Sequence, residues 1–388
     1  MTPTATNPVE PALAQPVPIR RLKSLDALRG FDMFWIIGGE EIFHVLAQTT
    51  GWTGAVFMAN QFTHVAWNGY RPYDNIFPLF LFLAGVSTPF AIGSRLEKGN
   101  ARASLARKII QRGLILVLLG VLYNNGIFEK PIGEWRFPSV LGRIGLAGMV
   151  AQLIYLYTYP NQRAQYLWFG GLLLGYWALL AFGAAPGFTP GDLTMKGNIV
   201  SYVDRLVLPG RLHLGIHDPE GLLSTLPAIG TGLLGIFAGT LLHRKAMAET
   251  RKVLWLLGLG CACLATGWLW NLVLPVNKNL WTSSFVLVTG GWSFLLLALF
   301  YWIIDVRGWQ SNATPAWSFF FVVIGMNSIL IYLAGNVLDF EHATQYFLGG
   351  VLQHTNPAVK GVGLVLGFLA AKWAFLYFLY RKNVFLRV

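Results

Sequence analysis

Charged residues are scarce in this chain. Asp, Glu, Lys and Arg make up only 12% of its 388 residues, about half the share found in an average soluble domain. A chain so poor in charge cannot cover a water-facing surface, and 55% of its residues are hydrophobic. This composition excludes an ordinary soluble protein and indicates one that is embedded in a lipid bilayer.

Cysteine and the common cofactor motifs are also nearly absent. The only two cysteines, Cys261 and Cys263, lie in an apolar segment, where a thiol behaves as a small hydrophobic group. The sequence contains no P-loop, no dinucleotide-binding glycine pattern, no HExxH and no CxxC motif. We therefore predict no bound metal.

The net charge of +12 does not indicate nucleic acid. Basic residues that bind phosphate backbones gather on one face or in one run, whereas here they lie between the apolar segments. Lys and Arg in short loops mark the cytoplasmic side of a membrane protein. The assignment that collects most of them there puts both termini in the cytoplasm.

What the sequence does contain is a series of apolar runs, each roughly 17–25 residues long, the length needed to cross a bilayer as a helix. We predict an all-α polytopic membrane protein with about ten transmembrane helices. Residues 1–20 are predicted to be a disordered cytoplasmic tail, since the first 18 include five prolines, and 21–388 a single transmembrane domain. The helices are expected at 26–46, 76–94, 109–126, 139–159, 166–184, 222–242, 253–274, 283–304, 316–338 and 358–380.

The first predicted helix carries polar groups at both ends. Charges near hydrocarbon cost several kcal/mol unless they are paired or hydrated, so they suggest a functional site. Asp26 and Arg29 lie one turn apart and can pair. Alternatively, Asp26 caps the helix and Arg29 lies among lipid headgroups, while Glu40, Glu41 and His44 occupy a water-exposed helix end.

A second polar group lies in the long predicted loop 47–75. His64 can act as a general base near neutral pH, and Asp74 is the nearest carboxylate that could orient it. The alternative is that Asp74 caps the next helix and His64 is one polar residue of a solvated loop. The loops 47–75 and 185–221 are too long for simple turns and are expected to fold into or over a cavity.

The chain contains the motifs RLKSLDALRG at 21–30, HVAWNG at 64–69, DNIFP at 74–78, DPEGL at 218–222, NKNLWTSS at 277–284 and GMNSILIY at 325–332. Together they resemble the motifs of the heparan-α-glucosaminide N-acetyltransferase family, including its bacterial NagX-like members. The resemblance covers about residues 20–380. It implies a fold of the transmembrane acyltransferase type, with the catalytic histidine of the family at His64.

The resemblance further implies an enzyme of a bacterial inner membrane. It would take acetyl-CoA from the cytoplasm and acetylate a glucosamine-type sugar on the other side, and it could be a homodimer. His64 would act as the base or carry the acetyl group, with Asp74 orienting it. The candidate acceptor-binding residues are Trp67, Asn68, Glu40, Asn327 and Ser328, and the candidate CoA-binding residues are Asp26, Arg29, Arg95, Arg102, Lys108 and Arg112.

A transporter of N-acetylglucosamine or a related amino sugar is the alternative function. Polar residues at both ends of one helix and aromatic-rich loops would also suit the passage of a sugar. Such a transporter would need neither His64 as a base nor a basic site for CoA.

Overall fold

The computed structural model describes residues 22–126, 129, 131–308 and 317–386, so the tail predicted for residues 1–20 lies outside the described residues. The protein is 73% helical and forms no strand in the described part, which confirms the all-α prediction. The helices in chain order are α1 (Lys23–Phe34), η1 (Trp35–Gly39), α2 (Glu41–Thr50), α3 (Thr53–Gln61), η2 (Pro72–Asn75), α4 (Ile76–Thr88), η3 (Pro89–Gly93), α5 (Ser94–Glu97), α6 (Arg102–Asn125), η4 (Ile132–Glu134), α7 (Val140–Thr158), α8 (Gln162–Phe182), α9 (Ile199–Val207), α10 (Thr225–His243), α11 (Glu249–Trp270), α12 (Ser283–Tyr301), η5 (Trp302–Val306), α13 (Trp317–Met326), α14 (Ser328–Ala334), α15 (Phe340–Leu352) and α16 (Pro357–Arg381).

The predicted number of ten membrane-spanning helices is too high. Seven helices of the described chain are long and apolar enough to cross a bilayer, and α13 and α14, bent by 69°, make an eighth if they count as one span. The predicted helices at 26–46 and 109–126 do not qualify. In the second case, basic residues at the start of α6 and two asparagines at its end shorten the apolar run.

The helix predicted at 26–46 is broken in the middle. Gly38 has φ 121°, a backbone conformation that other residues rarely adopt, so η1 ends the helix and α2 begins a new one. The break leaves the carbonyl of Ile37 without its helical partner, and the ammonium of Lys372 on α16 donates a hydrogen bond to it at 2.9 Å. A charged side chain thus supports the irregular backbone within the bundle.

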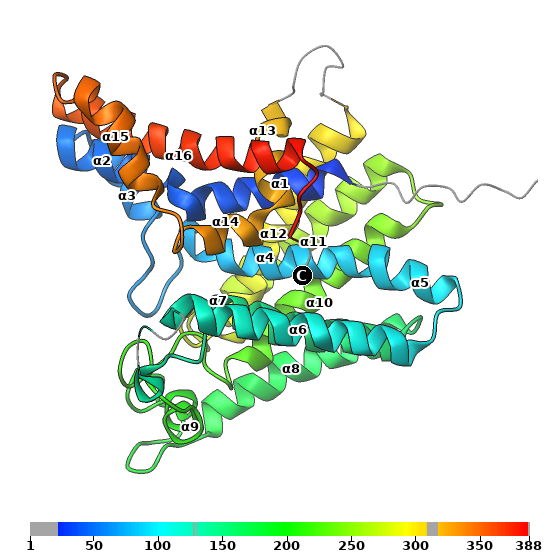
Figure 1. Cartoon of the computed structure of the whole chain (residues 1–388). Helices are drawn as coiled ribbons and strands as arrows, with labels where there is room; N and C mark the ends of the chain where they lie inside the picture. Colours follow the sequence, from blue (N-terminus) through cyan, green and yellow to red (C-terminus); the bar gives the residue numbers. More distant parts are fainter. Residues whose placement is uncertain (1–21, 127–128, 130, 309–316, 387–388) are drawn as a thin grey trace, which may run out of the picture.

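The centre of the bundle is formed by α4, α7, α10 and α12 (Figure 1), whose inward residues belong to one apolar core. Helices α4 and α10 approach so closely that a Cβ added to Gly235 would lie 1.9 Å from the carbonyl oxygen of Phe82. A similar contact joins α1 to α13, where a Cβ on Gly325 would lie 1.9 Å from the carbonyl oxygen of Asp26. Small residues at these crossings allow backbones to pack together as in other membrane bundles.

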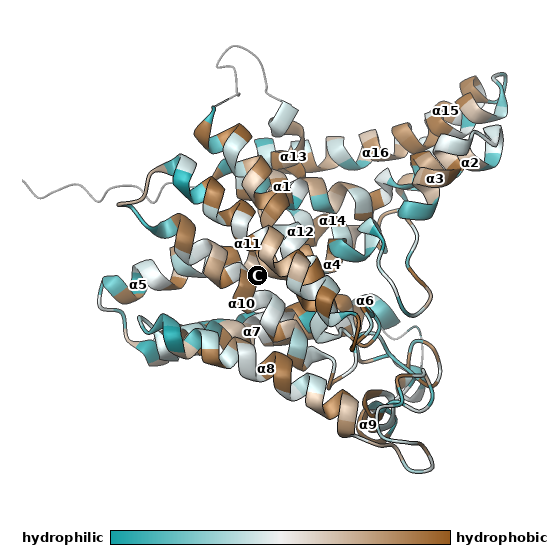
Figure 2. Cartoon of the chain, turned by 180° about the vertical axis from the view of Figure 1, so that it is seen from behind, coloured by the Kyte–Doolittle hydropathy of each residue, from teal (hydrophilic) through white to brown (hydrophobic). Residues whose placement is uncertain are grey.

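The outer helices expose apolar side chains instead of burying them. Leu167 on α8 is 76% exposed and Leu269 on α11 is 68% exposed, and the hydropathy colours of Figure 2 show hydrophobic residues along the outside of the bundle. A surface of this kind suits contact with lipid. The short helices α2, α3, α9 and α15 gather at one end of the bundle, opposite α5 (Figure 1), and the candidate site lies at their end.

Candidate active site

His64 and Asp74 form a hydrogen-bonded pair. His64 lies in the loop that follows α3, and its Nδ1 is 2.8 Å from Oδ1 of Asp74. The other carboxylate oxygen accepts the backbone N–H of Arg71 at 3.0 Å, which fixes the turn before α4. Asp74 therefore holds the turn η2 and also contacts the histidine, while the N-cap position of α4 belongs to Asn75 and not to Asp74. The carboxylate is fully buried while the imidazole is half exposed, an arrangement that suits a base approached by substrate.

Lys278 completes this cluster, although it is not among the candidate residues predicted from the sequence. Its Nζ lies 2.9 Å from Nδ1 and 2.8 Å from Nε2 of His64, and 3.7 Å from Oδ1 of Asp74. Burial lowers the pKa of Lys278, although the charge of Asp74 opposes this. Its place in the NKNLWTSS motif, between two asparagines, is the sequence signal that could have identified it.

The loop that carries Lys278 is anchored to the His64 loop at several points. The Asn277 side chain is fully buried and donates to Oδ1 of Asn68 at 3.0 Å. The Asn279 side chain donates to the carbonyl of Ala66 at 3.2 Å, and the N–H of Gly69 donates to the carbonyl of Val276 at 2.8 Å. These bonds hold Lys278 and His64 together as one rigid unit.

Two of the predicted acceptor-binding residues lie beside this pair. The indole N–H of Trp67 donates to the carbonyl of Leu193 at 2.9 Å, and its ring packs edge-on against His217. Trp67 thus joins the His64 loop to the segment 185–221. The amide nitrogen of Asn68 has no hydrogen-bond partner among the described residues, so it is available as a donor at the exposed side of the site.

Tyr73 connects Glu40 to the His64–Asp74 pair, which we call the dyad. The Tyr73 ring packs against His64 at 4.7 Å between centroids, and its hydroxyl donates to Oε1 of Glu40 at 3.4 Å. The second carboxylate oxygen of Glu40 is buried without a hydrogen-bond partner in the described part of the chain. The helix end that the sequence suggested to be water-exposed is therefore partly inside the bundle.

Other buried polar atoms without partners lie on α1 and at the end of η2. Oγ of Ser24, Oδ2 of Asp32 and both side-chain polar atoms of Asn75 are buried with no partner among the described residues. Such groups are normally hydrogen-bonded, and an exception needs an explanation. We call Ser24, Asp32, Glu40 and Asn75 the polar row. Ser24 and Asp32 lie on α1, Glu40 lies between η1 and α2, and Asn75 ends η2 just before α4, which packs against α1.

Four of the six predicted CoA-binding residues come together near the other end of the bundle. Arg112 of α6 lies close enough to Arg29 of α1 and Arg95 of α5 for their like charges to repel. Asp26 pairs with Arg29 at 3.4 Å, as predicted, but it is not the helix cap, since Leu22 holds that position without a side-chain bond. Cations gathered from three helices favour an anionic ligand.

The remaining predicted CoA-binding residues lie elsewhere. Arg102 donates to the carbonyls of Tyr157 and Tyr159 at 3.1 and 2.9 Å and so holds the end of α7. Lys108 is exposed on α6. Neither side chain is joined to the three arginines by a described contact.

Asn327 and Ser328 lie at the bend between α13 and α14. The Asn327 amide donates to the carbonyl of Val384 at 2.9 Å and accepts the N–H of Leu386 at 3.0 Å, so its amide group is already used by the C-terminal segment. Ser328 begins α14 and is buried. The described bonds connect Asn327 to the chain end and not to the His64 loop.

A second polar network stabilises the segment 185–221. Asp218 is fully buried and accepts two hydrogen bonds from the guanidinium of Arg136, at 2.8 and 2.7 Å, while Arg136 also pairs with Glu220. Burial favours the neutral acid, but the bonds and charge of Arg136 lower the pKa of Asp218. Nδ1 of His217 lies 2.7 Å from Oγ of Ser201, and burial lowers the pKa of this histidine to about 4.

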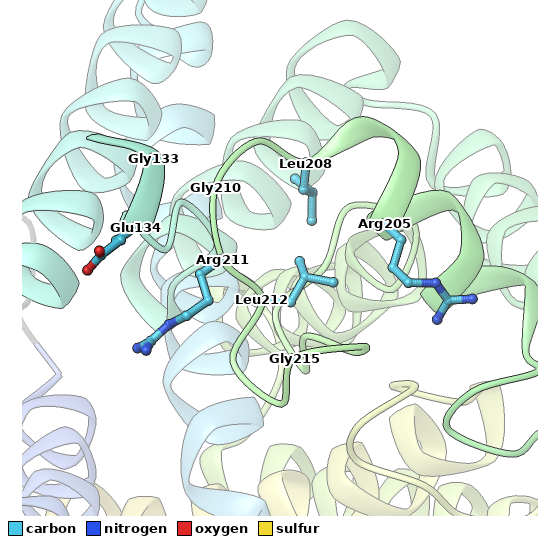
Figure 3. A pocket seen from close by; sticks show the side chains of 8 residues that line it. All are labelled: Gly133, Glu134, Arg205, Leu208, Gly210, Arg211, Leu212 and Gly215. Atoms are coloured by element: carbon cyan, nitrogen blue, oxygen red, sulfur yellow. The ribbon is translucent and has the colours of Figure 1, made fainter. Parts of the chain in front are cut away.

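The same segment lines a cavity of about 390 Å³ together with the turn around η4 (Figure 3). Arg205 and Arg211 lie on different sides of it, and Arg205 donates to the carbonyls of Ile216 and Lys196. His64 is not among its lining residues. The loop 185–221 therefore folds around a cavity that is separate from the dyad.

In the part of the chain that the structure describes, no group of three His, Cys, Asp or Glu residues is placed to hold a metal ion. No family model matches the sequence. The chain is 28% identical to human heparan-alpha-glucosaminide N-acetyltransferase and 29% identical to the mouse protein, in alignments that cover 95% of the chain. The chain spans 60% of the length of these relatives. The resemblance predicted from the motifs is confirmed.

Proposed function

Because the chain is homologous to the heparan-alpha-glucosaminide N-acetyltransferases over nearly its whole length, we propose that it is a membrane-embedded N-acetyltransferase. It would transfer the acetyl group of acetyl-CoA to the amine of a glucosamine-type sugar. The observation that carries this proposal is the dyad of a half-exposed His64 and a fully buried Asp74. A passage for sugar would not require a histidine oriented in this way.

In the proposed reaction, Nε2 of His64 removes a proton from the acceptor amine as the nitrogen attacks the thioester carbonyl. Asp74 keeps the proton on Nδ1 and stabilises the imidazolium that forms. The free amide nitrogen of Asn68 can donate to the carbonyl oxygen as negative charge develops on it, an interaction worth about 3 kcal/mol in well-studied hydrolases. The proton of His64 then passes to the leaving thiolate.

The donor is proposed to reach His64 through the bundle. Its phosphates would lie at Arg29, Arg95 and Arg112, since guanidinium groups bind phosphate well. From Ser24 to Glu40 the chain rises about 24 Å at 1.5 Å per residue, comparable to a pantetheine arm of roughly 15–20 Å. The two amides of this arm would supply hydrogen bonds to those buried atoms of the polar row that have no partner among the described residues.

The same proposal includes the orientation of the protein in the membrane, its oligomeric state and its cellular location. The three arginines would face the cytoplasm and His64 the opposite side of a bacterial inner membrane, with both termini cytoplasmic. The chain is expected to form a homodimer in lipid. Protease accessibility of tagged termini in oriented vesicles tests the first expectation, and light scattering of the purified protein tests the second.

The central test is the release of free thiol from acetyl-CoA by the purified protein in the presence of glucosamine or a glucosaminide. Wild type should release thiol and acetylate the sugar, whereas His64→Ala should do neither above background. If wild type releases no thiol while vesicles containing it accumulate N-acetylglucosamine without CoA, the alternative function as a sugar transporter is supported and the proposal fails.

A further inference from the structure

The amine of Lys278 lies against the imidazole of His64, almost equally close to both ring nitrogens. A general base must lie within about 2.6–3.2 Å of the group that it deprotonates, and Nζ of Lys278 is 2.8 Å from Nε2 of His64. Its side chain is mostly buried, with 17% exposed, beside a ring that is half exposed. The protein therefore carries an amine of its own beside the proposed base.

The backbone of Lys278 is held beside His64, so that only its side chain is left to turn aside. The residues on either side of it, Asn277 and Asn279, are bonded to the His64 loop, and Trp281 on the same loop is buried with φ 51°. The carboxylate of Asp74 attracts its ammonium from 3.7 Å. A lysine whose backbone is held by such a loop is a built feature of the site.

Resting on the proposed function, we propose that Lys278 is a self-acetylation site: when donor is bound and no sugar is present, its amine accepts the acetyl group. The lone pair of Nζ attacks the thioester carbonyl, an N–C bond forms and the C–S bond breaks. His64 takes one proton from Nζ and returns it to the departing thiolate. The products are free thiol and a neutral acetyl-lysine.

Acetylation of Lys278 would inhibit the enzyme whenever the acceptor sugar is scarce. Acetyl-lysine has no positive charge, so its attraction to Asp74 is lost, and the added acetyl group fills the space beside Nε2 of His64. A bound sugar would displace the Lys278 amine from the base and so protect it. Burial, which lowers the pKa of Lys278, increases the fraction of neutral amine that can react.

Other lysines provide matched controls. Lys196 and Lys360 are exposed, and no described contact joins either of them to a histidine. Purely chemical acetylation by a thioester would modify exposed lysines at least as fast as Lys278, whereas the proposed reaction is confined to the lysine beside His64.

The test incubates the full-length protein in detergent with acetyl-CoA alone and follows thiol release and peptide masses. Wild type is expected to release about one thiol per chain in a burst and to carry a hydroxylamine-stable acetyl group on Lys278. His64→Ala and Lys278→Arg should lose the burst, and added glucosamine should reduce the label on Lys278 by at least tenfold. If the Lys278→Arg variant does not fold, the presence or absence of the acetyl group on Lys278 in the wild-type peptide masses decides the question.

The outcomes separate the two proposals. Turnover with glucosamine but no acetyl group on Lys278, or equal labelling of Lys196 and Lys360, overturns the self-acetylation and leaves the proposed function standing. A hydroxylamine-labile acetyl group on His64 also overturns it, because the burst would then report an acetyl-imidazole intermediate. Absence of thiol release under every condition overturns both.

Discussion

Replacing Asp74 by Asn tests the proposed dyad with the smallest change of shape. Asp74 accepts two hydrogen bonds, one from His64 Nδ1 at 2.8 Å and one from the backbone N–H of Arg71 at 3.0 Å. An amide has only one acceptor oxygen. If that oxygen keeps the bond to Arg71, the amide NH₂ faces Nδ1 of His64. The histidine must then carry its proton on Nε2, where it can no longer act as a base.

The expected loss in kcat is about 10³-fold, or about 4 kcal/mol. The same tautomer change in a buried catalytic triad costs about 10⁴-fold, and we expect a smaller effect here because His64 is half exposed and water can support a reoriented ring. The assay is the initial rate of thiol release at saturating glucosamine. The unfolding temperature should change little, since the new side chain can still cap the turn.

Asp339→Asn is the matched control. Asp339 caps α15 by accepting the N–H of His342 at 2.8 Å, and Asn caps helices about as well as Asp, so both rate and stability should stay near wild type. An Asp74→Asn variant that keeps more than a tenth of the wild-type kcat would refute the assignment of Asp74 as the orienting carboxylate.

Three further predictions concern packing, donor binding and pH. Gly325→Ala should prevent correct folding, because its Cβ would lie 1.9 Å from a backbone oxygen of α1, whereas Gly171→Ala, with nothing within 4 Å of its Cβ, should behave as wild type in size-exclusion profiles and unfolding temperature. Arg112→Ala should raise the KM for acetyl-CoA about tenfold with little change in kcat, since one phosphate contact of about 1.4 kcal/mol is lost, and an unchanged KM would remove Arg112 from the donor site. Burial raises the pKa of Asp204 to about 6, so the native state binds more protons than the unfolded chain and stability falls as pH rises from about 4 to 6. His217, with its pKa lowered to about 4, has the opposite effect up to about pH 6.5. Asp204→Asn should therefore make the unfolding temperature rise more steeply with pH between 4 and 6 than in wild type, and an equal or shallower slope would contradict the assignment.

Much of the architecture could be predicted from the sequence because it depends on local composition. A run of apolar residues long enough to cross a bilayer forms a helix wherever it lies in the chain, and seven of the predicted helices were found in this way. The limits of this reasoning appear where backbone geometry intervenes. The break at Gly38 and the 69° bend after Met326 divide apolar runs that look continuous in the sequence.

Some residues of the candidate site could likewise be predicted from the sequence, whereas others are brought together only by the tertiary structure. His64 and Asp74 are ten residues apart, so their pairing could be proposed from sequence alone, and the family motif added the expected role of the histidine. Lys278 comes from 214 residues further along the chain, and Arg29, Arg95 and Arg112 come from three different helices. Only the packing of the bundle brings these cations to their places, because the contacts between helices depend on close backbone approach and interlocking side chains that composition does not encode locally.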